Sequence, residues 1–104
     1  NLKRTPAAQI LKARLQMEEK RLVEIGIPAE KLSPIREKVE EAQIRWRGLC
    51  EDYKRLKCNM QERSREKLLG MKAEVRRARR DFKSARVTWG AYTRHLRHTY
   101  AIQG

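Results

Sequence analysis

Two runs of apolar residues, spaced alternately by four and three residues, constrain the fold of this chain more than any other feature. The first run extends from Ile35 to Met60 and the second from Leu68 to Leu96. Residues at this spacing form one stripe along a helix, which packs against the stripe of another helix. The chain is therefore predicted to be all-α. The predicted partner-helix seam consists of Ile35, Val39, Trp46, Leu49, Tyr53, Leu56, Met60, Leu68, Met71, Val75, Phe82, Trp89, Tyr92 and Leu96.

A shorter helix precedes these runs. Thr5 is a suitable N-cap, and Pro6 suits the first helical position because its missing N–H has no partner there anyway. Gly26 suits a left-handed C-cap and is followed shortly by a proline. These signals predict a helix over residues 6–25.

The same signal of a capping residue before proline recurs at Ser33 and Pro34. It predicts a connector over residues 26–33 and a second helix that begins at residue 34. Helices joined by so short a connector fold back on each other. We therefore expect an antiparallel helical hairpin in which residues 1–104 form a single helical domain.

The step from Met60 to Leu68 is one residue longer than a heptad, and it has two interpretations. A single long, coiled-coil-like helix over residues 34–98 is favoured, because one extra residue returns the apolar stripe of a straight helix to its starting face. The absence of proline and glycine from residues 61–67 agrees with it. The alternative is a three-helix bundle with a break near residues 59–66.

The charge of the chain is +13 and is unevenly distributed. Residues 67–104 hold ten basic and two acidic side chains, whereas residues 1–66 hold 16 basic and 11 acidic ones. The C-terminal third is therefore the expected site for an anionic partner, of which a phosphate backbone is the commonest.

Heptad positions separate the two signs of charge in this C-terminal third. Both acids, Glu74 and Asp81, lie on one flank of the seam, while the other flank and the outer face are basic. Most of the cations are arginine, whose planar fork suits phosphate. The predicted nucleic-acid-binding residues are Lys72, Arg76, Arg77, Arg79, Arg80, Lys83, Arg86, Arg94 and Arg97.

The sequence contains no pattern of catalytic or cofactor-binding residues. It has no glycine-rich phosphate loop, paired-cysteine zinc motif or nucleotide fingerprint. His95 and His98 lie one helical turn apart, but a metal site needs further ligands and none is near in sequence. We therefore expect a protein that is not an enzyme, with no cofactor, no metal site and no small-molecule substrate.

Cysteine usage and hydropathy predict where the protein works. Cys50 and Cys58 are about 12 Å apart along one helix, beyond the ~7 Å between α-carbons that a disulfide allows. Reduced cysteines predict an intracellular, reducing compartment, either the mitochondrial matrix or the nucleus and cytoplasm. No apolar run approaches the roughly 18 residues of a membrane span, so no membrane partner is expected.

These features predict a structural, RNA-backbone-binding subunit of a large, ribosome-like ribonucleoprotein. Its basic face would contact RNA, and its apolar seam would contact other protein subunits or a second copy of the chain. The alternative is a coiled-coil interaction or scaffold protein that binds partner helices, with a basic face that only tunes specificity.

Overall fold

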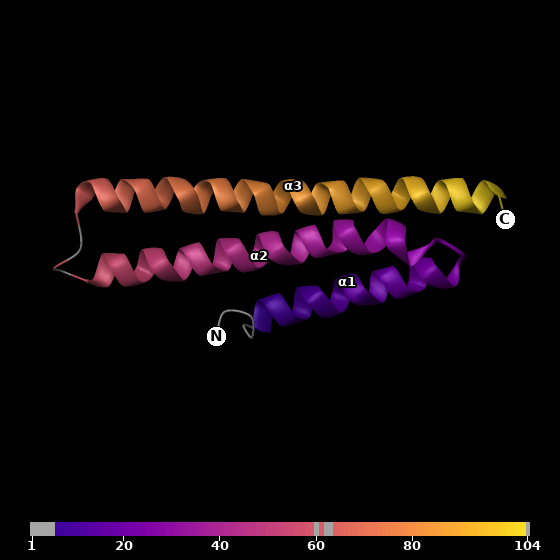
Figure 1. Ribbon diagram of the computed structural model, residues 1–104, viewed down its shortest axis with the longest axis horizontal. Helices are drawn as coiled ribbons and strands as arrows, with labels where there is room; N and C mark the ends of the chain where they lie inside the picture. The colour runs from indigo at the N-terminus through magenta and orange to yellow at the C-terminus, as the bar shows by residue number, and fades with distance from the viewer. Residues whose placement is uncertain (1–5, 60, 62–63, 104) are drawn as a thin grey trace.

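The computed structural model describes residues 6–59, 61 and 64–103. These residues form three helices and no strand: α1 (Pro6–Glu24), α2 (Ala29–Cys58) and α3 (Arg65–Gln103). Each helix runs antiparallel to the one before it, and the bundle is elongated, measuring 62 × 22 × 16 Å (Figure 1). The all-α prediction is confirmed.

The favoured continuous helix over residues 34–98 is wrong, and the alternative with a break near residues 59–66 is what the structure shows. The chain reverses between α2 and α3, so the second heptad run packs against the first. On a single straight helix, neither apolar stripe would be covered by the other. Helical periodicity is the same in both arrangements, so only burial distinguishes them.

At this reversal, local hydrogen bonds satisfy backbone groups at the end of α2 and the start of α3. The N–H of Asn59 donates to the carbonyl oxygen of Arg55 at 3.0 Å, and Asn59 Oδ1 accepts from the N–H of Gln61 at 3.0 Å. Ser64 Oγ accepts from the N–H of Lys67 at 3.1 Å, as an N-cap does for the third residue of a helix. Asparagine and serine therefore supply the turn without proline or glycine.

The end of α1 matches the sequence prediction to within one residue. Gly26 has φ +103°, and its N–H donates to the carbonyl oxygen of Val23 at 3.0 Å, while the N–H of Ile27 donates to that of Leu22 at 3.1 Å. This pair of bonds is the Schellman motif, with Ile27 and Leu22 both buried beside it. The predicted cap at Thr5 lies outside the described residues.

The predicted connector over residues 26–33 is too long, because α2 begins at Ala29. Pro28 takes the N-cap position, and Pro34 lies inside the helix. The hydroxyl of Ser33 does not cap α2 but donates to Glu19 Oε1 at 2.7 Å. Leu32 is fully buried, and its burial accounts for the extra first turn.

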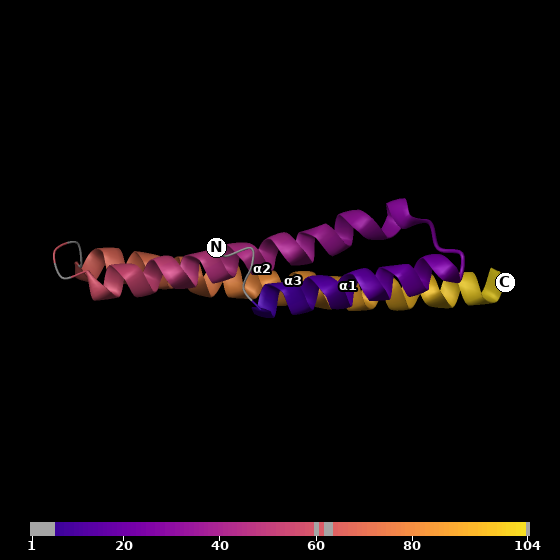
Figure 2. The same cartoon turned by 90° about the horizontal axis from the view of Figure 1, so that it is seen from below.

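The core lies where all three helices run side by side, along the first half of α2 and the second half of α3 (Figures 1 and 2). Seam side chains from α2 and α3 meet leucines from α1 there, and aromatic rings Trp46 and Phe82 stack with centroids 5.5 Å apart. The buried cluster comprises Leu11, Leu15, Leu22, Ile27, Leu32, Val39, Phe82, Trp89 and Leu96.

Beyond the start of α1, the bundle narrows to two helices. None of the described residues between 48 and 77 is buried, although the heptad pattern continues through them. We call this part the tip. Its seam side chains are half-buried: Leu49, Tyr53, Leu56, Leu68, Met71 and Val75.

The cap at Ser64 gives a test of the reversal. Ser64→Ala removes the acceptor for the N–H of Lys67 and is expected to lower the free energy of unfolding by about 0.5–2 kcal/mol. Ser84→Ala is the matched control, because Ser84 is exposed inside α3 and alanine is the better helix former. Urea unfolding followed by circular dichroism would measure both. Equal stabilities of the two variants would contradict the capping role.

Candidate nucleic-acid interface

Two neighbouring carboxylates of α1 attach it to the other two helices. Glu18 Oε2 accepts a hydrogen bond from the indole Nε1 of Trp89 in α3 at 2.7 Å. Glu19 accepts from Ser33 and forms an ion pair with Arg36, both in α2. Glu18 interrupts the apolar stripe of α1 because its partner, an indole N–H, is itself in the core.

Arg36 is held between two carboxylates. Its Nη1 lies 2.8 Å from Glu40 Oε1, its Nε contacts Glu19, and only 14% of its side chain is exposed. Burial alone would lower the pKa of Arg36, but the hydrogen bond and charge of Glu40, with those of Glu19, outweigh it and raise the pKa. This guanidinium therefore stabilises the α1–α2 contact and is not available to a ligand.

The predicted nucleic-acid-binding cations have a different environment. All nine are exposed, and none forms an ion pair with a carboxylate of the described residues. In that part of the chain, the paired cations are Arg36, Lys54 and Arg55, all of α2. The charge of α3 is thus left without internal compensation.

Eight of the nine cations share one side of α3. At 100° per residue they fall within an arc of about 120°, centred near Lys83, and Arg77 lies outside it. We call this arc the cationic face. Four of its members line one shallow depression of the surface: Arg76, Arg79, Arg80 and Lys83. The other four are Lys72, Arg86, Arg94 and Arg97.

The cationic face continues into a groove between α1 and α3, with a volume of about 480 Å³. The acid among its lining residues is Glu18, whose Oε2 already accepts a hydrogen bond from the indole N–H of Trp89. Gly90 also lines it and has no neighbour within 4 Å of the position a Cβ would take, so the backbone is open to an approaching ligand. We call this the arginine groove. Its arginines are Arg14, Arg21, Arg86, Arg94 and Arg97.

Arg14 and Arg21 were missed by the sequence analysis. They lie seven residues apart beside the leucine stripe of α1. This spacing indicates that the two arginines share a flank of α1. That they face a ligand site follows only from the packing of α1 next to α3.

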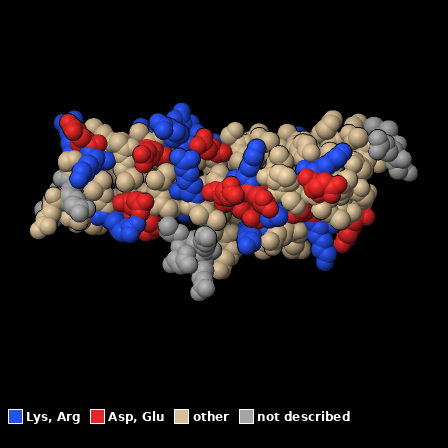
Figure 3. Space-filling model, viewed as in Figure 1, with Lys and Arg blue, Asp and Glu red and all other residues tan. Residues whose placement is uncertain are grey.

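The acids of α3 lie away from this groove. Asp81 lines a shallow pocket on the α2 side, together with Lys38 and Arg45. In the view of Figure 3, acidic and basic side chains are interspersed along the length of the molecule. The segregation of charge is therefore a local property of α3 and the α1 edge beside it.

The seam residues are brought together within the chain. Val39, Phe82, Trp89 and Leu96 are buried in the core, and Ile35, Trp46 and Tyr92 pack against it. The remaining described members form the half-buried tip, and Met60 lies outside the described residues. Contact of this seam with another polypeptide stays a prediction.

Other classes of site are scarce in the described part of the chain. It holds no group of three or more His, Cys, Asp or Glu side chains placed to bind a metal ion. No described helix has an apolar stretch long enough to span a bilayer. Cys50 and Cys58 are free thiols, and the cellular compartment stays a prediction.

Comparison with protein-family models, with curated proteins and with solved structures finds no match to this chain. The interface is therefore characterised by its own geometry and charge.

The bond between Glu18 and Trp89 can be tested directly. Glu18→Ala leaves a buried indole N–H without an acceptor and is expected to lower the free energy of unfolding by about 1–3 kcal/mol. Glu18→Gln keeps an acceptor oxygen and should lose less. Glu24→Ala, at an exposed position of the same helix, is the control. Chemical denaturation would measure all three variants, and a Glu18→Ala variant as stable as the Glu24→Ala variant would refute the role.

Proposed function

We propose that this protein is a non-enzymatic, structural subunit of a large ribonucleoprotein and binds the sugar-phosphate backbone of RNA. The observation that carries the proposal is the continuous arginine-rich surface formed by the cationic face and the arginine groove. Its cations are exposed and unpaired within the described structure, and they come from two helices.

Unpaired cations one turn apart on a helix repel one another by a few tenths of a kcal/mol per pair. α3 carries several such pairs, for example Arg76 with Arg80 and Arg79 with Lys83. A polyanion removes this repulsion and releases its own counterions when it binds. The unfavourable arrangement of α3 is thus relieved by a ligand with regularly spaced negative charges.

The length and rigidity of α3 suit a structural role. A helix of 39 residues extends about 58 Å, and its apolar side is fixed by the core at Phe82, Trp89 and Leu96. The cations are therefore presented along a rigid support rather than on a loop. Such contacts position a nucleic acid without reading its sequence.

The tip favours a second candidate function, that of a coiled-coil interaction protein. Its heptad side chains are only half-buried, whereas Phe82, Trp89 and Leu96 in the three-helix part are buried. A partner helix from another subunit or a second copy would cover them as α1 covers the other half. The two functions are compatible, because the tip and the arginine groove lie at different ends of the bundle (Figure 1).

Salt dependence gives the first test of RNA binding. If six to eight cations contact phosphates, the affinity for generic RNA should fall with salt with a log–log slope of roughly −5 to −7. The triple variant Arg76→Glu, Arg79→Glu, Lys83→Glu should bind more weakly, and its slope should be smaller in magnitude by about one for each lost contact. Fluorescence anisotropy with a labelled RNA at several salt concentrations measures both quantities.

The control is a triple variant with the same change in net charge on α2, Lys38→Glu, Lys54→Glu, Lys57→Glu, at exposed positions. It should keep the slope of the unmodified protein. Equal losses in the two triple variants would show that net charge alone governs binding and would overturn the assignment of the site.

Light scattering tests the second candidate. If the tip binds a second copy, the protein without RNA should associate, and Leu56→Lys together with Val75→Lys should return it to a monomer. Both side chains are half-buried at the tip, so the change places charge in the apolar contact. A protein that is monomeric at high concentration before any substitution would exclude self-association through the tip.

A further inference from the structure

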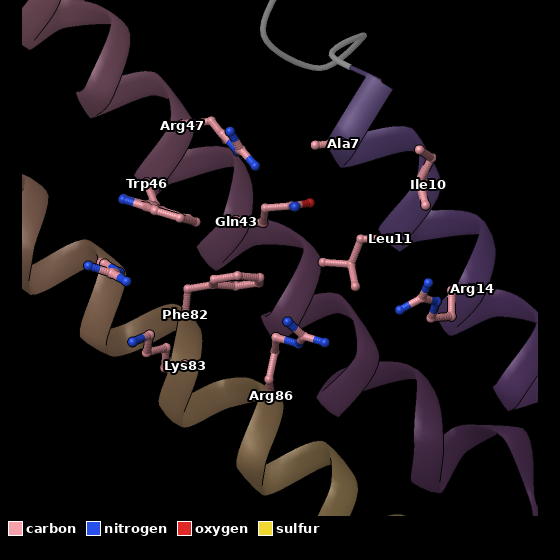
Figure 4. Close-up of a pocket in the computed structure, with 11 residues that line it drawn as sticks. Ala7, Ile10, Leu11, Arg14, Gln43, Trp46, Arg47, Phe82, Lys83 and Arg86 are labelled. Atoms are coloured by element: carbon pink, nitrogen blue, oxygen red, sulfur yellow. The ribbon is translucent and has the colours of Figure 1, made fainter.

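A pocket opens where the start of α1 meets α2 and α3. It has a volume of about 450 Å³, within the range of about 300–1,000 Å³ for pockets that take small ligands. All three helices line it (Figure 4). We call it the junction pocket.

Its walls combine an apolar floor with polar groups around it. Leu11, Trp46 and Phe82 supply the floor. In Figure 4 the side chains of Arg14 from α1, Gln43 and Arg47 from α2, and Arg86 from α3 extend into the same space. Lys83 and Arg79 complete the cationic lining. No carboxylate lines the pocket, so a neutral or anionic ligand is favoured.

Two of these guanidinium groups lie over aromatic rings. Arg47 is 5.1 Å from the centre of the Trp46 ring, and Arg86 is 5.7 Å from that of Phe82. The Nε of Arg47 is buried and has no hydrogen-bond partner in the described structure. Guanidinium planes held in this way stack well against a flat π system.

The junction pocket is continuous with the arginine groove. Leu11, Arg14 and Arg86 line both. A strand whose phosphates follow the groove therefore passes the mouth of the pocket. The groups that meet there are those used for an unpaired base: stacking planes, an amide that can bond to a base edge, and cations for the flanking phosphates.

From this continuity we infer that the junction pocket takes one unpaired nucleobase of a single-stranded RNA whose backbone lies in the arginine groove. The inference rests on the proposed RNA-binding function and adds to it a preference for single strands. The amide of Gln43 and the guanidinium of Arg47 contact the base, and Arg14 and Arg86 contact the adjoining phosphates.

The test compares two labelled probes, a short oligoadenylate and an abasic oligomer with the same sugar-phosphate backbone and charge. A base in the pocket should make the oligoadenylate bind about tenfold more tightly. Ala7→Phe fills the pocket from α1 without changing charge and should abolish this preference while the affinity for the abasic oligomer stays the same. Ala13→Phe, exposed on the same helix and outside the pocket, should keep the preference.

The outcomes separate the two proposals. Equal, salt-dependent binding of both probes to the unmodified protein would overturn the inference and leave backbone binding intact. Failure to bind either probe at about 50 mM salt would overturn the proposed function itself. An Ala7→Phe variant that is folded by circular dichroism and still prefers the oligoadenylate would place the base elsewhere and would also overturn the inference.

Discussion

The attachment of α1 through Glu18 and Glu19 is the interaction on which the rest of the structure depends. Glu18 accepts from the indole of Trp89, and Glu19 contacts Ser33 and Arg36, so one turn of α1 is fixed to both other helices. Without this attachment, α2 and α3 would still form a hairpin, because their heptad stripes match. The core around Trp89, the arginine groove and the junction pocket all require α1 in place.

Much of the fold could be predicted from the sequence, because helical periodicity and a glycine cap are local signals. The all-α class and the Schellman end at Gly26 follow from such signals. The reversal near Ser64 was only the alternative interpretation, because an inserted residue preserves the stripe of a straight helix and a single serine is a weak signal for a cap. The start of α2 was misplaced for a related reason: Ser33 resembles a cap, but its hydroxyl is used by Glu19.

The cationic face was also predictable, because it lies on one helix and its members recur at helical spacing. The groove was not, since its two walls come from helices that are far apart in sequence. Arg14 lies beside Arg86 because α1, with Leu11 and Leu15 in the core, packs against α3. Sequence patterns therefore identify the residues that share a face of one helix, whereas a site built between helices depends on tertiary packing that those patterns do not encode.

The pairing of the acids in this protein agrees with the proposed role of α3 as a binding surface. α2 carries six acidic side chains, enough to neutralise much of α3 if they faced it. Instead, Glu37 and Glu40 lie within 4 Å of Arg36, and Glu51 and Asp52 pair with Lys54 and Arg55 of their own helix. Solubility requires only net charge, and mixed signs on every face would supply it without repulsion. Four of the six acids of α2 thus lie beside cations of their own helix, and the cations of α3 remain exposed, as the proposed binding of a polyanion requires.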